Sequence, residues 1–285
     1  ILQGYSDPRL ERWFATNNAD IYSTDDELSP VVEKATKYLG VRQGVPMTRT
    51  EYQGYSKTSR VGIPEQGPRP VLRVAEAYFL RAEGMLRNWN MGDGTPESLY
   101  NEGIHSAWAS VLGDESGWAG TYESYINGFI NTEEGGDFDW ELFEGGFGSA
   151  PYINYRNQEY NYYIEENGKQ VGINRISVRW HDEDSPEKKL QRIITQKWIS
   201  FFPTLSSVAW TEYRRTGYPK LIPIPSDLNY SNGAIDTELQ IRRLPFTQSE
   251  YRGNTEEVNK ALGLLKGPDN GGTRLWWDVD KGNFE

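Results

Sequence analysis

The chain has 285 residues, a formal net charge of −11 and no cysteine. The negative charge argues against nucleic-acid partners and against direct adhesion to anionic lipids, because both require a positively charged surface. The missing cysteines exclude disulfides, thiolate catalysis and Cys-ligated metals. No apolar run of about 18 residues is present to predict a membrane span. We expect a single domain over residues 1–285.

Residues 70–112 are predicted to form the first of two helical hairpins. Pro70 occupies a first-turn position, and apolar residues follow it at helical spacings. The residues of this helix expected to face inward are Val71, Val74, Ala75, Tyr78, Ala82, Met85 and Leu86. Glu83 and Arg87 are spaced as an i,i+4 ion pair. Asp93-Gly94 is expected to end the helix.

Thr95 and Pro96 supply the cap and first turn of the returning helix. A second hairpin is predicted at about 186–215, with Ser185-Pro186 starting its first helix and Pro203-Thr204 its second. A last short helix is expected from Thr255 to Gly263 or Gly267. The inward-facing residues of the three hairpin helices are Tyr100, Ile104, Ala107, Trp108 and Val111, then Leu190, Ile193, Ile194, Trp198 and Phe201, then Leu205, Val208, Ala209 and Tyr213.

Residues 113–175 are predicted to be a loop region, in which aromatic side chains are interleaved with Asp, Asn, Gln and Glu. Such mixtures suit sugars, because a pyranose stacks its apolar face on an aromatic ring while its hydroxyls bond carboxamides and carboxylates. The alternative is that these rings fill the core of a chain with few aliphatic residues. The candidate ligand-binding residues are Trp118, Tyr122, Trp89, Asn90 and Trp140.

Several segments, taken in order along the chain, resemble one family. Q-K-W at residues 196–198 precedes W-T-E-Y-R-R-T-G-Y-P at 210–219, and the tail contains I-R-R-L-P-F at 241–246 and T-R-L-W-W-D at 273–278. Together with G-Y-S-D-P-R-L at 4–10, these segments resemble the SusD/RagB family of surface glycan-binding lipoproteins. The resemblance covers nearly the whole chain and is weakest between residues 113 and 175.

The resemblance implies a mainly α fold of tetratricopeptide-like helical hairpins with long irregular loops. It also implies that the chain corresponds to the C-terminal portion of the family, whose N-terminal half and lipid-bearing cysteine are not in this sequence. The implied function is non-catalytic binding of oligo- or polysaccharide at the extracellular face of the outer membrane. The implied partner is a SusC-type TonB-dependent transporter, with membrane attachment only through a lipid anchor on the absent N-terminal part.

Two other functions stay open from the residues alone. The chain has 41 acidic residues, and two suitably spaced carboxylates are enough for a glycoside hydrolase. The helical pairs are also suited to a scaffold that holds a protein partner. A turnover assay separates the hydrolase from the binder, and a glycan array separates the binder from the scaffold.

No cofactor or metal is expected. The acidic groups at 25–27, 137–139 and 182–184 offer oxygen donors for calcium, but none has EF-hand spacing, so solvated loops are the preferred interpretation. Neither His105 nor His181 lies in a zinc-binding spacing. No cysteine, nucleophile or phosphate-binding motif is present.

Arg214-Arg215 admits two interpretations. Paired guanidinium groups chelate carboxylates well, which would make a substrate clamp. The preferred interpretation is structural: the arginines favour the C-terminus of the fourth helix, which Gly217 ends. Arg242-Arg243 is interpreted in the same way, and Trp276-Trp277 is expected to be a packed staple near the C-terminus.

Overall fold

The computed structural model of the chain describes residues 2, 7–15, 56–59, 70–112, 125, 163–166, 169–172, 176, 178–221, 224, 228–279 and 281–285. Its helices and strands in chain order are α1 (Arg9–Trp13), α4 (Val74–Leu86), α5 (Pro96–Leu112), β1 (Tyr163–Glu166), β2 (Lys169–Gly172), α9 (Pro186–Phe201), α10 (Ser206–Thr216), α11 (Gln248–Gly253) and α12 (Thr255–Leu264).

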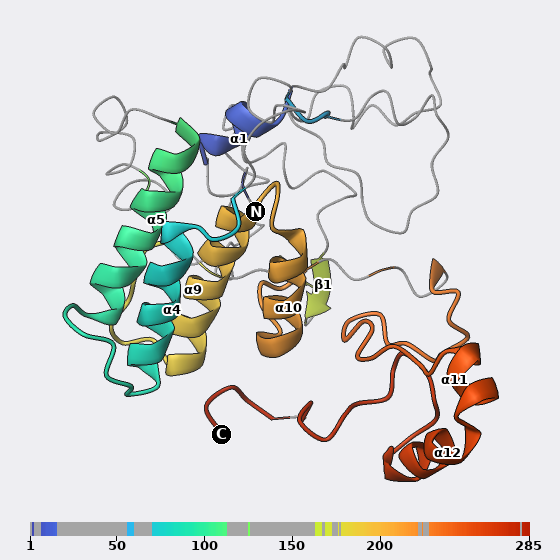
Figure 1. The fold of residues 1–285 in the computed structure, drawn as a ribbon. Coiled ribbons are helices and arrows are strands. Elements are labelled where there is room, and N and C mark those ends of the chain that lie inside the picture. The colour runs from blue at the N-terminus through green and yellow to red at the C-terminus, as the bar shows by residue number, and fades with distance from the viewer. Residues whose placement is uncertain are drawn as a thin grey trace, which may run out of the picture.

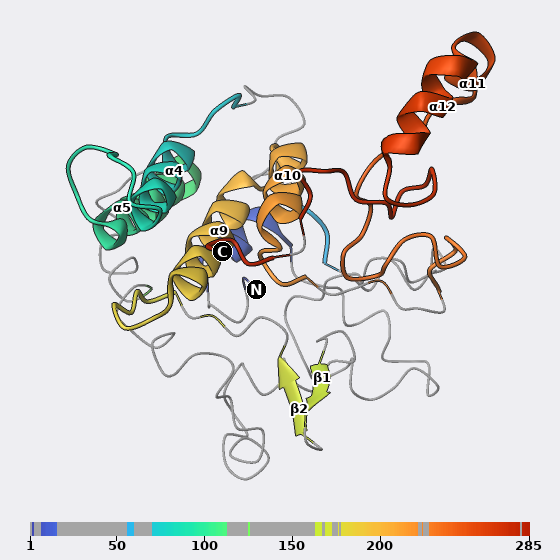
Figure 2. The same cartoon turned by 90° about the horizontal axis from the view of Figure 1, so that it is seen from below.

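Four helices form the centre of the described structure. α5, α4, α9 and α10 stand side by side in a row (Figure 1), with α4 packed against α5 and α9, and α10 packed against α9. β1 and β2 pair as a short antiparallel ladder from Tyr163↔Gly172 to Glu166↔Lys169 (Figure 2). The prediction of a mainly helical fold is therefore confirmed.

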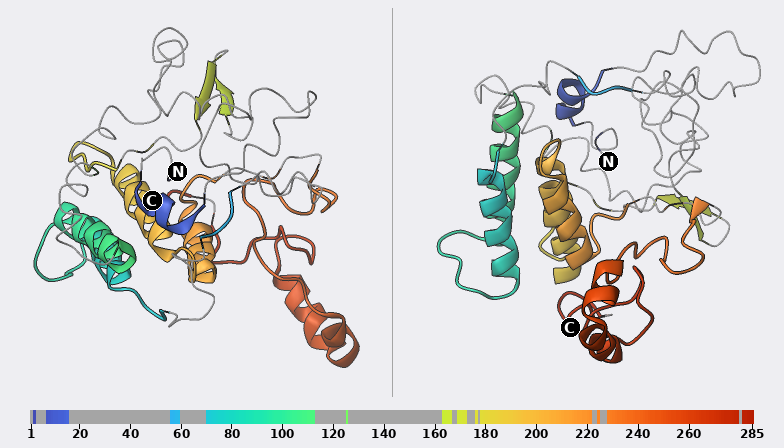
Figure 3. Two further views of the ribbon diagram at one scale, coloured as in Figure 1. Left: turned by 90° about the horizontal axis from the view of Figure 1, so that it is seen from above. Right: turned by 45° about the vertical axis from the view of Figure 1, so that its right-hand side comes forward.

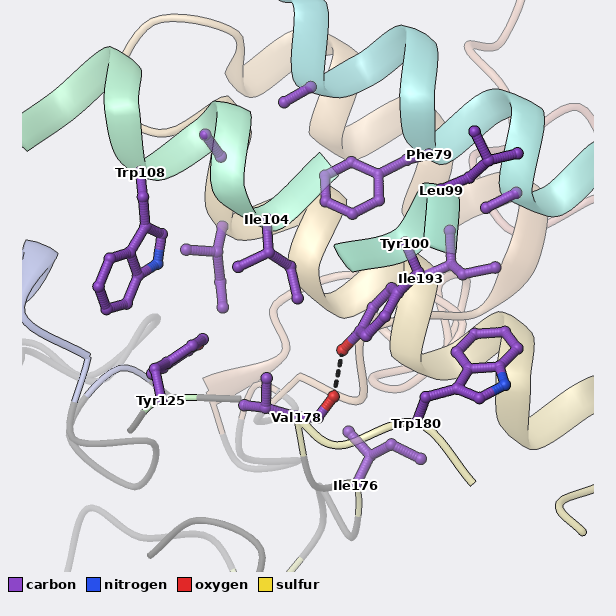
Figure 4. Close-up of a cluster of buried hydrophobic side chains, with 14 of the residues drawn as sticks. Phe79, Leu99, Tyr100, Ile104, Trp108, Tyr125, Ile176, Val178, Trp180 and Ile193 are labelled. Atoms are coloured by element: carbon purple, nitrogen blue, oxygen red, sulfur yellow. Dashed lines mark hydrogen bonds between the residues drawn. The ribbon is translucent and has the colours of Figure 1, made fainter. Parts of the chain in front are cut away.

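The main core lies between α4, α5 and α9. Phe79, Tyr100 and Ile193 are fully buried there, and Trp108 is almost completely buried (Figure 4). The Tyr100 hydroxyl donates to the Val178 carbonyl at 2.6 Å, which satisfies the one polar atom of that side chain. Aromatic rings thus supply much of the core volume that aliphatic side chains supply in other proteins.

A glycine sets the close approach of α4 and α5. A Cβ atom at Gly103 would lie 2.6 Å from the ring of Phe79, which is closer than real Cβ contacts allow. The missing side chain at Gly103 therefore makes room for the Phe79 ring. Large and small residues interdigitate here as in other well-packed cores.

The start of the first hairpin differs from the prediction. α4 begins at Val74, not at Pro70, because Arg73 is an extended N-cap residue whose Nη2 donates to the Phe202 carbonyl at 3.4 Å. Val71 and Val74 are consequently exposed, so the expectation that they face inward is wrong. The buried stripe of α4 is Ala75, Phe79 and Ala82.

The second hairpin follows its local signals. The Ser185 hydroxyl caps α9 by accepting from the Lys188 N–H at 3.3 Å, with Pro186 at the first helical position. α10 begins at Ser206, two residues beyond the predicted restart at Thr204. It ends at Gly217, whose φ of 75° is left-handed, as the sequence predicted.

An ion-pair cluster centred on Glu83 joins the two hairpins. Its carboxylate accepts from Arg87 Nε at 3.0 Å, as the i,i+4 spacing predicted. It also accepts from the two terminal nitrogens of Arg215 on α10, at 2.6 and 2.7 Å, across 132 positions of sequence. Arg215 donates further to Glu212, which lies 3.3 Å from Lys197 Nζ on α9. The cluster therefore connects three helices.

The chain beyond α10 forms a projecting arm, which contains α11 and α12, and then returns to the helix row. α11 and α12 pack on each other and extend away from the helix row (Figures 1 and 3). Residues 281–285, which we call the C-terminal strap, lie back on the row. Asn283 Nδ2 donates to Glu187 of α9 at 2.5 Å and to the Thr216 carbonyl of α10 at 3.1 Å. Arg87, the C-cap residue of α4, donates to the Asn283 carbonyl at 2.9 Å. The strap thus contacts α4, α9 and α10.

Candidate functional site

The turn between α4 and α5, residues 87–95, carries two of the candidate residues; we call it the Trp89 turn. Its first half is fixed by the Trp89 backbone N–H, which donates to the Gly84 carbonyl at 2.9 Å. Its second half is held by Arg81 of α4, which donates to the carbonyls of Met91 at 3.0 Å and Asp93 at 2.8 Å. One arginine therefore fixes the path of the chain through the turn.

Side-chain packing against α4 also fixes the Trp89 turn. The Met91 side chain lies so close to α4 that a Cβ atom at Gly84 would come within 2.5 Å of its sulfur. At the far end, the Thr95 hydroxyl accepts from the Ser98 N–H at 3.1 Å and caps α5. These contacts leave the turn with one well-defined geometry.

Trp89 and Asn90 are presented on this fixed turn. Trp89 is 60% exposed, and Asn90 is exposed beside it. Asn90 Oδ1 accepts from the Gly92 N–H at 3.2 Å, which leaves the amide nitrogen as the group that can donate to a ligand. An exposed indole next to an amide donor can stack a pyranose ring and bond one of its polar substituents.

The other three candidates, Trp118, Tyr122 and Trp140, lie in parts of the chain that the structure does not describe. Tyr125, from the same aromatic region, is buried with its ring 4.9 Å from that of Trp108, and its hydroxyl donates to Asp7 at 3.1 Å. For Tyr125, the core-filling alternative is therefore correct.

Within the acidic group at 182–184, two carboxylates are bonded to neighbouring side chains of the protein. Asp184 accepts from Arg192 at 2.6 Å and pairs with Lys188 at 3.3 Å. Burial alone would raise the pKa of Asp184, but these two cations lower that pKa below its ordinary value. Asp182 accepts from Trp180 Nε1 at 3.1 Å. The acidic groups at 25–27 and 137–139 lie outside the described residues.

Within the described ranges, no group of three or more His, Cys, Asp or Glu side chains is placed to hold a metal ion. No helix in the same part of the chain combines the length and hydropathy that crossing a bilayer requires.

Both arginine pairs are engaged inside the protein, as the structural interpretation predicts. Arg215 binds Glu83 and Glu212, and a terminal nitrogen of Arg214 donates to the Arg242 carbonyl. Arg242 pairs with Asp278, and Arg243 pairs with Asp269. Arg214 and Arg242 connect α10 to the later segment, while Arg215 acts within the helix row and Arg243 within the later segment.

Trp276 and Trp277 contradict the expectation of a packed staple. Trp276 is 83% exposed and Trp277 is 60% exposed. The two residues lie at a turn that the Asp278 N–H closes by donating to the Leu275 carbonyl at 2.9 Å, and their rings stand next to each other in solvent. The sequence carried no signal for this exposure, since Leu275, Trp276 and Trp277 form a short apolar run, which favours burial.

The described residues thus form a mainly helical protein built of helical hairpins, with an exposed indole and an exposed amide on one inter-helix turn. The family model described as "Susd and RagB outer membrane lipoprotein" matches residues 1–125 and 147–278. The chain therefore belongs to the SusD-like family. No curated protein matches the chain.

Solved SusD homologues agree with this assignment. A chitin-binding SusD homologue from Flavobacterium johnsoniae is 36% identical over 100% of this chain and 49% of its own length, with a TM-score of 0.67. A SusD homologue from Bacteroides uniformis is 29% identical over 98% of this chain and 48% of its own length, with a TM-score of 0.69. A SusD homologue from Bacteroides vulgatus is 33% identical over 99% of this chain and 48% of its own length, with a TM-score of 0.66. The chain spans about half the length of these relatives.

Proposed function

We propose that this chain is the C-terminal, carbohydrate-binding part of a SusD-like surface protein and that it binds oligosaccharide without cleaving it. SusD-like proteins are non-catalytic carbohydrate-binding lipoproteins. The Trp89 turn is the observation that carries the proposal, because it offers a ring and an amide donor in a fixed geometry.

The glycan class that we propose is an oligosaccharide of N-acetylglucosamine. The homologue that is 36% identical over the whole chain is described as chitin-binding. An N-acetyl group adds a carbonyl, which can accept from Asn90 Nδ2, and a methyl group, which can lie against the Trp89 indole. The same turn would therefore recognise both the sugar ring and its substituent.

Trp89→Ala is expected to weaken chitohexaose binding about three- to tenfold, because one ring contact contributes about 0.5–1.5 kcal/mol. Isothermal titration calorimetry on the purified chain measures this change. Tyr230→Ala is the matched control, since Tyr230 is an exposed ring on another segment, and it should leave the affinity unchanged. Equal affinity of the Trp89→Ala variant and the parent chain would refute the role of this turn, and release of reducing ends from chitohexaose would refute non-catalytic binding.

We also propose that the full-length protein lies at the extracellular face of the outer membrane and delivers glycan to a SusC-type TonB-dependent transporter. The family description as an outer membrane lipoprotein supports this location. The net charge of −11 disfavours direct adhesion to anionic head groups, so attachment of the full-length protein is assigned to a lipid anchor.

Affinity purification of the full-length protein in mild detergent tests the partner. A large outer-membrane β-barrel is expected to come down with it. Recovery of the full-length protein alone would count against the transporter partnership while leaving glycan binding to the calorimetric test.

A further inference from the structure

The turn formed by residues 275–278, which we call the tandem-Trp turn, exposes two large aromatic side chains. The ring centroids of Trp276 and Trp277 are 5.2 Å apart, and the ring planes are perpendicular. The two rings are 83% and 60% exposed. A perpendicular pair with this exposure can offer one ring face to a flat apolar surface and the second ring to its edge.

Ion pairs hold the tandem-Trp turn in place. The Asp278 N–H donates to the Leu275 carbonyl at 2.9 Å and closes the turn. The Asp278 carboxylate accepts from Arg242 Nε at 2.6 Å and lies 3.4 Å from Arg274 Nη1. Arg242 Nη2 reaches the Arg214 carbonyl on α10 at 3.4 Å. The rings therefore stand on a turn tied to the helix row, which reduces the conformational entropy that a ligand must remove on binding.

The tandem-Trp turn is linked to the Trp89 turn by a short stretch of chain. From Trp277 the chain runs to the C-terminal strap, whose Phe284 ring lies 4.9 Å from the Arg87 guanidinium, at the start of the Trp89 turn. In Figure 1 the last part of the chain passes beneath α10 toward the lower end of α9. The seven residues from Trp277 to Phe284 span at most about 25 Å, so one extended oligosaccharide can reach both turns.

The surroundings of the rings suit a sugar. Here the two rings are flanked by Arg274 and Asp278, with Arg242 behind them. A pyranose matches this arrangement, because its ring face is apolar and its rim carries hydroxyls that need polar neighbours.

From this geometry we propose that Trp276 and Trp277 form a second pyranose-binding platform, which acts together with the Trp89 turn on one extended glycan. The inference rests on the proposed glycan-binding function and extends it to a second, separate site. Two weak sites on one glycan raise the apparent affinity, because binding at the first site sets a high effective concentration at the second.

The experiment compares chitohexaose with chitobiose on the purified chain. Replacement of both Trp276 and Trp277 by Ala should weaken chitohexaose binding about tenfold. The same double variant should leave the affinity of the Trp89 turn for chitobiose nearly unchanged. Val279→Ala is the matched control, because Val279 is a 54% exposed apolar side chain next to the turn. In chain labelled with 5-fluorotryptophan, the ¹⁹F signals assigned to Trp276 and Trp277 by single Phe variants should shift with either sugar.

The outcomes separate this inference from the proposed function. If the double variant binds chitohexaose as the parent chain does and the two ¹⁹F signals stay fixed, the second platform is refuted and glycan binding stands. If Val279→Ala weakens binding as much as the double variant, the tandem-Trp turn is a general apolar docking surface and the proposal of a sugar platform is refuted. If the parent chain binds no chitohexaose, both proposals fail. Circular dichroism verifies that the variants keep their helices.

Discussion

Replacement of Asp7 by Asn is expected to lower the free energy of unfolding by about 3–5 kcal/mol, because it leaves Arg9 as an unpaired charge in the core. Both side chains of this pair are fully buried. Arg9 Nε donates to the two Asp7 oxygens at 2.9 and 3.2 Å, and Nη2 donates to Oδ2 at 2.5 Å. Burial alone would lower the pKa of Arg9, but Asp7 raises it, so the guanidinium stays charged. Urea denaturation followed by circular dichroism measures the change.

Two controls make the Asp7 result interpretable. Asp93→Asn changes an exposed carboxylate in the Trp89 turn and should alter the unfolding free energy by less than about 0.5 kcal/mol. The double variant Asp7→Ala with Arg9→Met removes both charges and should be more stable than Asp7→Asn, because no buried charge is left uncompensated. A single variant as stable as the parent chain would show that Arg9 does not depend on Asp7.

Replacement of Glu83 by Ala is expected to cost about 3 kcal/mol, since it removes the carboxylate shared by Arg87 and Arg215. The value is set at the low end for a buried pair because the Arg215 side chain is 40% exposed and water can solvate it. Glu102→Ala, an exposed substitution within α5, is the control and should change stability little. Denaturation of both variants under identical conditions measures the difference, and a cost no larger than that of the control would contradict the structure.

The contribution of Glu83 should also depend on pH in a defined direction. Burial alone would raise the pKa of Glu83, but the hydrogen bonds from Arg215 and Arg87 lower it below its ordinary value. A carboxylate with a lowered folded-state pKa stabilises the protein above its unfolded pKa of about 4.3 and loses that effect as the pH falls through the folded value. The stability difference between the parent chain and Glu83→Ala should be constant from pH 7 to about 5 and shrink below about 4.3. A difference that grows on acidification would be inconsistent with the Glu83 ion pairs.

Parts of the candidate site could be predicted from the sequence because they depend on neighbouring residues. Asp93-Gly94 and Thr95-Pro96 predict a break and a new helix, which places Trp89 and Asn90 in a turn between helices. The structure places both residues on an exposed turn. Their binding role stays a prediction, as do the roles of Trp118, Tyr122 and Trp140 outside the described residues.

The sequence by itself determined the helical hairpins, the Ser185-Pro186 start of α9, the Gly217 end of α10 and the Glu83–Arg87 pair. Each of these depends on groups within one or two helical turns, so local pattern is sufficient. It also indicated the SusD-like family through motifs in a fixed order. It did not predict that Arg73 would remain outside α4, because the carbonyl that holds it belongs to Phe202, on the other hairpin.

The tertiary structure alone decided which charges distant in sequence meet, and that Trp276 and Trp277 remain exposed. Arg215 reaches Glu83 across 132 positions, and Asn283 returns to contact three helices, through contacts that no local spacing encodes. The exposure of Trp276 and Trp277 was likewise decided by packing: Asp278 is drawn to Arg242, which fixes the turn and leaves the two indoles in solvent. Hydrophobicity predicts burial only where the chain has a neighbouring surface to bury against, and that surface is a property of the whole fold.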